Sequence, residues 1–95
     1  MINKKLYGRL KIMVDYIDAH EFSINNKVQL LKDEKCGCFY CLEIFSPVEI
    51  TAWVEDPSVT ALCPYCGIDS IIGESAGFPI TKEFLGKMKL HWFGV

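Results

Sequence analysis

Residues 38–41 are Cys-Phe-Tyr-Cys and residues 63–66 are Cys-Pro-Tyr-Cys, with 21 residues between the two pairs. Two intervening residues allow a tight turn that brings both thiolates of a pair onto one face. Two such turns facing each other place four sulfur atoms at the corners of a tetrahedron, as in structural zinc sites. The spacing therefore predicts one Zn²⁺ bound by Cys38, Cys41, Cys63 and Cys66.

A site with four thiolate ligands leaves no open position for water or substrate, so we expect a structural and not a catalytic metal. Three alternatives to zinc are a thioredoxin-like redox pair, a rubredoxin-like iron site and a core of free thiols. The redox pair needs a βαβ context, which the pattern does not indicate. Gly67 follows the second pair and permits positive φ, whereas Leu42 follows the first. We therefore expect a less regular first turn, which disfavours iron.

A fifth cysteine, Cys36, lies two residues before the first pair. We interpret it as a neighbouring free thiol. The alternative is that Cys36 replaces Cys38 as a ligand and forms a Cys-x₄-Cys pair with Cys41.

The net charge of −2 is unevenly distributed along the 95 residues. Residues 36–81, here called the acidic segment, contain no Lys or Arg and carry −6, whereas residues 1–35 and 82–95 each carry +2. A metal bound by four thiolates would make this segment more negative still, so it should repel phosphate and attract a basic protein. The candidate partner-binding residues are its six acids, Glu43, Glu49, Glu55, Asp56, Asp69 and Glu74. The aromatic residues between and beside the cysteines are predicted to form a small core over the metal: Phe39, Tyr40, Phe45, Trp53 and Tyr65. The alternative is that some of them line a protein-binding surface.

The rest of the chain predicts helices around this centre. Residues 4–20 carry Leu6, Leu10, Met13 and Ile17 at helical spacing. Ser23 is predicted to cap a second helix that runs to about residue 33, which would complete a helical pair. Further predictions are a short helix from Ser46-Pro47, strands over residues 60–62 and 68–72, a loop over residues 73–79, and a terminal helix capped by Thr81.

We therefore predict an α+β fold in one domain, residues 1–95. Residues 1–35 form the N-terminal helical pair, residues 36–78 a zinc ribbon with short β-strands, and residues 79–95 a C-terminal helix. No secretory signal is visible at the N-terminus, and no stretch approaches the ~20 apolar residues of a membrane span. We expect a cytoplasmic protein with no membrane contact.

One motif suggests catalysis but lacks its context. Residues 73–77 match the Gly-x-Ser-x-Gly nucleophile elbow, which requires a helix directly after the serine. Pro79 follows too soon for that, so we expect a loop and no enzyme activity. His20 and His91 have no ligand-like neighbours at fixed spacing and are predicted to lie in the last turns of helices.

Residues 36–50 and 61–81, with the Cys-Pro-Tyr-Cys-Gly sequence at their centre, resemble a family of small bacterial cytoplasmic zinc-ribbon proteins. The resemblance covers residues 36–93. It implies the same four cysteine ligands and no catalytic residues, and some members of the family resemble immunity-type genes beside toxin genes.

Two functions follow as hypotheses. The first is a protein-binding module, most concretely an immunity protein or antitoxin whose acidic surface neutralises a basic nuclease toxin. The alternative is a nucleic-acid-binding regulator, which needs the basic residues of the terminal segments to form one patch: Lys4, Lys5, Arg9, Lys11, Lys87 and Lys89.

Overall fold

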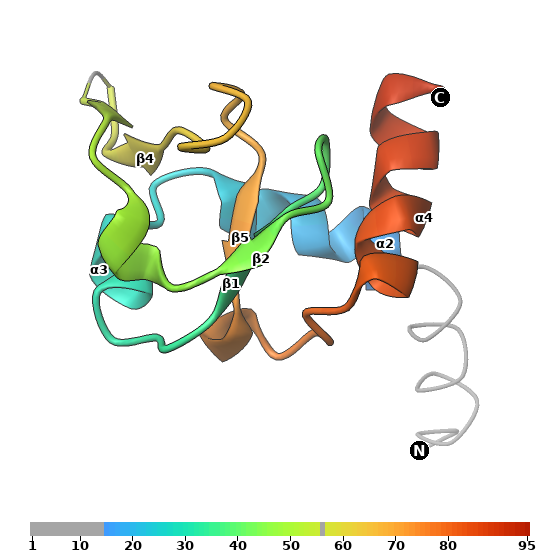
Figure 1. Cartoon of the computed structure of the whole chain (residues 1–95), viewed down its shortest axis with the longest axis horizontal. Coiled ribbons are helices and arrows are strands. Elements are labelled where there is room, and N and C mark those ends of the chain that lie inside the picture. The colour runs from blue at the N-terminus through green and yellow to red at the C-terminus, as the bar shows by residue number, and fades with distance from the viewer. Residues whose placement is uncertain (1–14, 56) are drawn as a thin grey trace, which may run out of the picture.

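The computed structural model describes residues 15–55 and 57–95 and has an α+β architecture (Figure 1). A three-stranded sheet lies at the centre, with a small two-stranded sheet on one side and the C-terminal helix on the other. In chain order the elements are helix α2 (Asp15–Asp18), 3-10 helix η1 (Ala19–Ser23), helix α3 (Lys27–Leu30), strands β1 (Cys36–Cys38) and β2 (Ile44–Phe45), 3-10 helix η2 (Pro47–Glu49), strands β3 (Trp53–Val54), β4 (Thr60–Ala61) and β5 (Ile71–Gly73), 3-10 helix η3 (Glu74–Ala76) and helix α4 (Lys82–Phe93). None of the described helices has the length and apolar character needed to cross a bilayer.

The central sheet is antiparallel and has the strand order β2-β1-β5. Cys36 pairs with Phe45 on one side and with Gly73 on the other, and Cys38 pairs with Ile71. Strands β3 and β4 pair separately, with Trp53 opposite Ala61. These short hairpins bring the two cysteine pairs to the same end of the central sheet.

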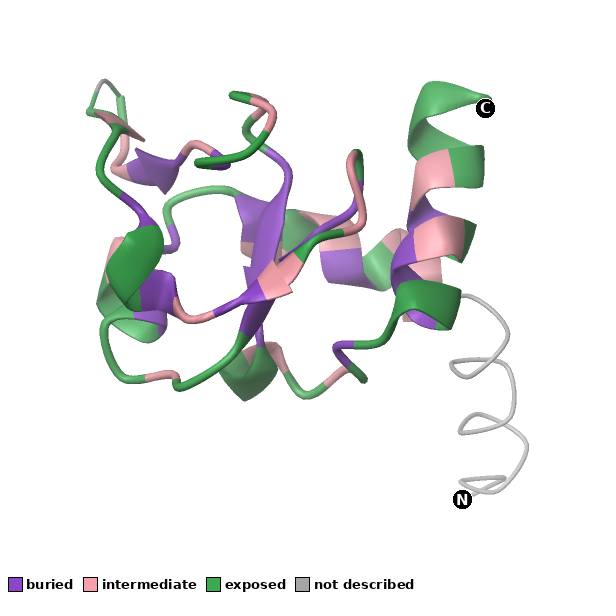
Figure 2. Ribbon diagram, in the orientation of Figure 1, coloured by how far each residue is buried: buried purple, intermediate pink, exposed green. Residues whose placement is uncertain are grey.

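The two faces of β1 bury different groups, because successive side chains of a strand point to opposite faces. Cys36 and Cys38 face one apolar cluster, which also contains Phe45, Ala61 and Ile71. The opposite face of the sheet, to which Ile72 of β5 contributes, packs against Leu85 and Met88 of α4. Figure 2 shows the buried residues concentrated in the central strands and on the lower turns of α4.

Gly37 permits this close packing of α4 on the sheet. A Cβ at position 37 would lie 2.7 Å from Leu85 Cδ1 and 3.1 Å from Ile80 Cγ2. Both distances are below normal van der Waals contact, so the absence of a side chain here lets α4 approach β1.

The predicted N-terminal helical pair is not confirmed. Most of the helix expected over residues 4–20 lies outside the described residues, and its described part is α-helical only to Asp18 before it tightens into η1. Ser23 does not cap the second helix, because its hydroxyl donates to the carbonyl of His20 at 2.7 Å. Helix α3 instead begins after Asn26 and has a single turn.

Asn26 replaces Ser23 at the helix start because its amide bonds to the preceding turn and to two segments far away in the chain. Its Nδ2 donates to the carbonyl oxygens of Phe22 (3.2 Å) and Ile71 (2.9 Å), and its Oδ1 accepts from the N–H of Ala61 at 3.0 Å. The side chain is 3% exposed, so these bonds join η1, β4 and β5 in the interior.

Two other predicted helix starts agree with the structure, whereas one predicted strand begins later than expected. Ser46 caps η2 by accepting from the N–H of Val48, with Pro47 at the first position, although the helix is a single 3-10 turn. Thr81 caps α4 by accepting from the N–H of Phe84. The strand expected over residues 68–72 begins only at Ile71, because Ile68 still belongs to the second cysteine turn and accepts from the N–H of Cys63 at 3.0 Å.

Candidate metal centre

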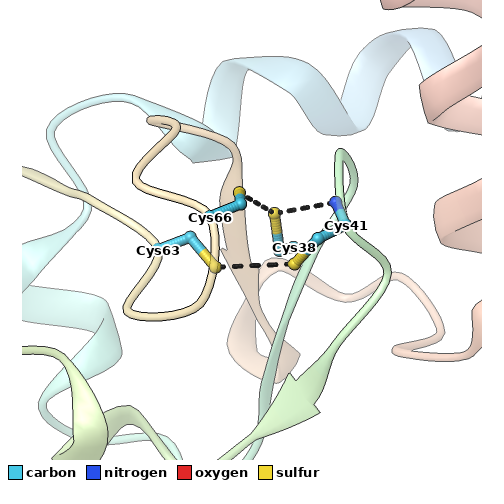
Figure 3. Close-up of side chains that lie close together, drawn as sticks. All are labelled: Cys38, Cys41, Cys63 and Cys66. Atoms are coloured by element: carbon cyan, nitrogen blue, oxygen red, sulfur yellow. Dashed lines mark hydrogen bonds between the residues drawn. The ribbon is translucent and has the colours of Figure 1, made fainter.

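Four thiols meet between the two cysteine turns (Figure 3). The Sγ atoms of Cys38, Cys41, Cys63 and Cys66, here called the cysteine cluster, all lie within 4.8 Å of one another. The Cys38–Cys66 and Cys41–Cys63 sulfur pairs are 3.6 and 3.7 Å apart. Zn–S bonds of about 2.3 Å in a tetrahedron require sulfur atoms about 3.8 Å apart. The cluster therefore has the size and the donor set to bind one metal ion.

Backbone N–H groups point at the sulfurs in both turns. Cys38 Sγ accepts from the N–H groups of Tyr40 (3.3 Å) and Cys41 (3.4 Å), and Cys63 Sγ accepts from the N–H of Tyr65 at 3.3 Å. These donors stabilise negative charge on the first cysteine of each pair. The acidic segment itself contains no Lys or Arg, and among the described residues the basic side chain that hydrogen-bonds to these turns is Lys82, whose Nζ donates to the carbonyl of Leu42 at 2.8 Å.

The first turn is as regular as the second, which corrects the sequence expectation. Gly67 has φ of 81° and its N–H donates to the carbonyl of Cys63 at 2.8 Å. Leu42 has φ of 67° and its N–H donates to the carbonyl of Cys38 at 2.9 Å. Leu42 thus adopts the left-handed conformation that a glycine would take, and the missing glycine no longer argues against iron.

The thiols of the cluster differ in their acidity. Burial raises the pKa of Cys41 to about 11 and raises the pKa of Cys66 well above its usual value. At Cys38 burial also acts to raise the pKa, but hydrogen bonds, chiefly that with Ser70, outweigh it and the pKa is lowered. Four adjacent thiolates repel one another unless a cation lies between them, and metal binding removes their protons.

Ser70 is a residue of this centre that the sequence did not reveal. It is 1% exposed and its hydroxyl oxygen lies 3.0 Å from Cys38 Sγ. A serine four residues after a cysteine pair carries no recognisable signal. Cys38 pairs with Ile71 across the sheet, and this pairing brings Ser70, which precedes Ile71, beside the Cys38 sulfur.

Cys36 lies apart from the cysteine cluster. Its Sγ donates to the carbonyl of Phe45 at 3.5 Å, and it is not among the residues whose sulfurs meet. Burial raises its pKa to about 12. Cys36 is therefore a protonated thiol of the apolar core, and the cluster contains Cys38 as the spacing predicts.

The structure brings some of the six candidate acids together and separates others. Glu49 accepts a hydrogen bond from the Tyr65 hydroxyl, and this bond, with the nearby charge of Glu43, raises the pKa of Tyr65 to about 12. Asp69 is exposed and lines a pocket with its neighbour Ser70. Glu74 lies at the far end of β5, where it accepts from the N–H of Glu34 at 3.3 Å. Glu55 follows β3 and is exposed, and Asp56 lies outside the described residues.

The aromatic residues near the cysteines form a core only in part. Phe39 and Phe45 are 1% and 7% exposed, and Trp53 packs against the cluster face of the sheet. Tyr40 and Tyr65 are 37% and 54% exposed, so they belong to the surface.

The structure places the serine of the Gly-x-Ser-x-Gly stretch on the surface and both histidines against aromatic rings. Ser75 Oγ donates to Asp33 Oδ2 at 3.0 Å, and the residues around it form the 3-10 helix η3 instead of the helix an elbow requires. The His20 ring lies 4.1 Å from the Trp92 ring, and the His91 ring 5.6 Å from the Tyr16 ring. Both histidines thus pack against aromatic side chains.

No family model, curated protein or solved structure matched this chain. What the structure supports is a small α+β protein whose four clustered cysteines are able to bind a metal ion.

Proposed function

We propose that the cysteine cluster binds one structural Zn²⁺. The observation that supports this is the pair of sulfur–sulfur distances, 3.6 and 3.7 Å, close to the edge of a Zn–S₄ tetrahedron. All four coordination positions are taken by the protein, so the metal joins the two turns and takes no part in chemistry.

Metal analysis of the purified protein tests this site. We expect one zinc per chain, resistant to weak chelators, and loss of that zinc in Cys38→Ser. Cys36→Ser is the matched control and should keep a full equivalent, because its sulfur bonds to the Phe45 carbonyl outside the cluster. Iron instead of zinc, no metal, or equal loss in both variants would contradict the proposal.

We further propose that the protein is a binding module for a basic protein. The supporting observation is the acidic segment, which contains six acids and no Lys or Arg. Five of these acids are exposed: Glu43, Glu49, Glu55, Asp69 and Glu74. A metal-bound scaffold would hold these charges in fixed positions, which speeds association with a positive surface and disfavours acidic partners.

The most concrete form of this function is an immunity protein or antitoxin. A nuclease presents a basic cleft to its nucleic acid, and an acidic protein surface competes for that cleft. Glu43 and Glu49 are the central contacts in this proposal, because both charges act on Tyr65, whose hydroxyl donates to Glu49 and whose ring is exposed.

Affinity capture from the native host tests the proposal, with the metal-loaded chain and its Glu43→Gln/Glu49→Gln variant as paired baits. We expect a basic protein to be captured by the first and lost with the second, and its capture to weaken with added salt. Protection of cells against the product of a neighbouring gene would identify an antitoxin. Equal capture by both baits, or capture of nothing, would refute the acidic-surface proposal.

Nucleic-acid binding is the competing outcome. In the described residues, Lys89 Nζ lies 5.3 Å from the Tyr40 ring centroid, beside the acidic segment, where it faces an aromatic ring. The four residues Lys4, Lys5, Arg9 and Lys11 lie outside the described residues. A gel shift at low salt that vanishes with added salt would favour this alternative.

A further inference from the structure

A small pocket opens between the C-terminal turns of α4 and the end of the central sheet that holds the cysteines. Its volume is about 230 Å³, enough for one side chain. The C-terminal end of α4 and the tip of the β1–β2 hairpin lie at the same end of the molecule (Figure 1). The lining residues on which the argument depends are His20, Phe39, Asp69, Trp92 and Phe93.

The aromatic walls of this pocket are held in place by contacts with one another and with Tyr16 and Tyr40 outside it. Trp92 Nε1 donates to the carbonyl of Tyr16 at 3.3 Å, and its ring lies 4.1 Å from that of His20. Phe93 lies 4.8 Å from the Tyr40 ring and 5.9 Å from the Phe39 ring. Trp92 and Phe93 still expose 39% and 38% of their surface. The rings of Trp92 and Phe93 are therefore fixed in position and accessible to a ligand. Covering them would be favourable, because the exposure of apolar surface to water costs free energy.

The pocket presents one carboxylate, beside the imidazole of His20. The carboxylate is that of Asp69, and no Lys or Arg occurs among the described residues that line the pocket. An anionic group beside aromatic faces attracts cations, because the ring faces carry partial negative charge. The same aromatic group already holds a cation at its outer ring, where Lys89 Nζ lies 5.3 Å from the Tyr40 centroid.

We propose that this aromatic pocket binds an arginine side chain of the protein partner. A guanidinium group is planar and weakly hydrated, so it can stack on Trp92 or Phe93 while it pairs with the Asp69 carboxylate. Lysine has a compact, strongly hydrated charge and gains less from such a site. The inference rests on the proposed function, since it gives one anchor point to the basic partner expected there.

An NMR titration of the metal-loaded protein tests the pocket directly. The probe is N-acetyl-arginine amide, and N-acetyl-citrulline amide is its neutral control of the same shape. We expect saturable shifts at the Trp92 indole N–H and at the Asp69 amide with the arginine probe, and at least roughly threefold weaker binding for citrulline. The blocked lysine amide should bind more weakly than arginine.

Two variants separate the pocket from the general charge of the surface. Asp69→Asn should weaken arginine binding roughly three- to tenfold. Glu55→Gln removes the same charge from the acidic segment outside the pocket and should leave binding unchanged. Absence of shifts at Trp92 and Asp69, equal binding of citrulline, or equal weakening by both variants would overturn the pocket proposal.

The same pair of variants distinguishes the failure of this inference from failure of the proposed function. If the captured basic partner binds wild type and Asp69→Asn equally, the pocket is refuted while the acidic-surface function survives. If the arginine probe binds at Trp92 and Asp69 but no basic protein is captured, the proposed function fails and the pocket remains as a guanidinium site.

Discussion

Ser70 lies beneath the cysteine cluster, where its hydroxyl oxygen is 3.0 Å from the Cys38 sulfur. When Cys38 is a thiolate the hydroxyl must donate, because a thiolate has no proton to give. This bond fixes the orientation of one ligand and adds a third donor to the two backbone N–H groups on the same sulfur. Groups of this kind outside the ligand set orient the ligands and tune the metal site.

Ser70→Ala should therefore weaken zinc binding by about 10- to 100-fold while the fold is retained. The measurement is competition with a chromophoric zinc chelator. Ser75→Ala is the matched control, because its hydroxyl bonds to Asp33 on the exposed surface and should leave the affinity unchanged. Equal zinc affinity of Ser70→Ala and wild type would show that the hydroxyl has no role in ligand positioning.

Leu42 shows at the residue scale what the sequence could not predict. The cysteine spacing predicted the cluster correctly, because a Cys-x-x-Cys turn has few possible geometries. The left-handed φ of 67° at Leu42 was not predicted, since this region costs a non-glycine residue roughly 1–2 kcal/mol. The turn accepts this cost because it reverses the chain after Cys41, so that the carbonyl of Glu43 accepts from the N–H of Cys38 at 3.0 Å. In addition, the Leu42 side chain packs against the apolar cluster beneath α4.

At the element scale, strand β5 and helix α3 meet at Gly73. A Cβ at this position would overlap the Asp33 carboxylate and would lie 2.8 Å from Leu30 Cδ2. Asp33 cannot move away freely, because its Oδ2 accepts from both the N–H and the hydroxyl of Ser75. Gly73 thus allows the segment after α3 to close over the end of the sheet.

Gly73→Ala should destabilise the protein by about 1–3 kcal/mol, the usual cost of overpacking. Gly86→Ala is the matched control, because position 86 lies inside α4 and no atom of the described residues outside this helix's backbone lies within 4 Å of an added Cβ. That control should stabilise the protein by about 0.5–1 kcal/mol, since alanine favours a helix interior more than glycine does. Urea unfolding of both variants measures the difference. A Gly73→Ala protein as stable as wild type would mean that Asp33 has another position.

The accuracy of the predicted element boundaries depended on whether the capping interaction was local. Thr81 and Ser46 accept from N–H groups two or three residues further along the chain, so the sequence alone indicated both helix starts. Asn26 is bonded to Ala61 and Ile71, 35 and 45 residues away, and such contacts leave no local pattern. Ser23 had the better local pattern, but the tertiary bonds of Asn26 determine where α3 begins.

At the scale of the whole molecule, two apolar clusters share the central sheet, and the four cysteines of the candidate metal centre belong to or pack against one of them. The cluster that contains Cys36, Cys38 and Cys63 is built from two-residue and three-residue strands. The other contains Leu85 and Met88 and depends on the twelve-residue helix α4. Strands so short contribute few ladder hydrogen bonds, and a chain of 95 residues buries a modest fraction of its surface.

Removal of the metal should therefore unfold the cysteine-bearing side first. Zinc binding contributes on the order of 10 kcal/mol in small zinc modules, and a whole domain is stable by only about 5–15 kcal/mol. We expect a strong chelator to increase amide hydrogen exchange in β1, β2 and β5 more than in α4, and added Zn²⁺ to reverse it. Acid should have the same effect, because protons compete with the metal for the thiolates.

Cys36→Ser is the control for this experiment. It should respond to chelator as wild type does, because the Cys36 sulfur that it removes lies outside the cluster. Unchanged exchange in β1 and β5 after complete metal removal would show that the apolar contacts alone hold the two cysteine turns together.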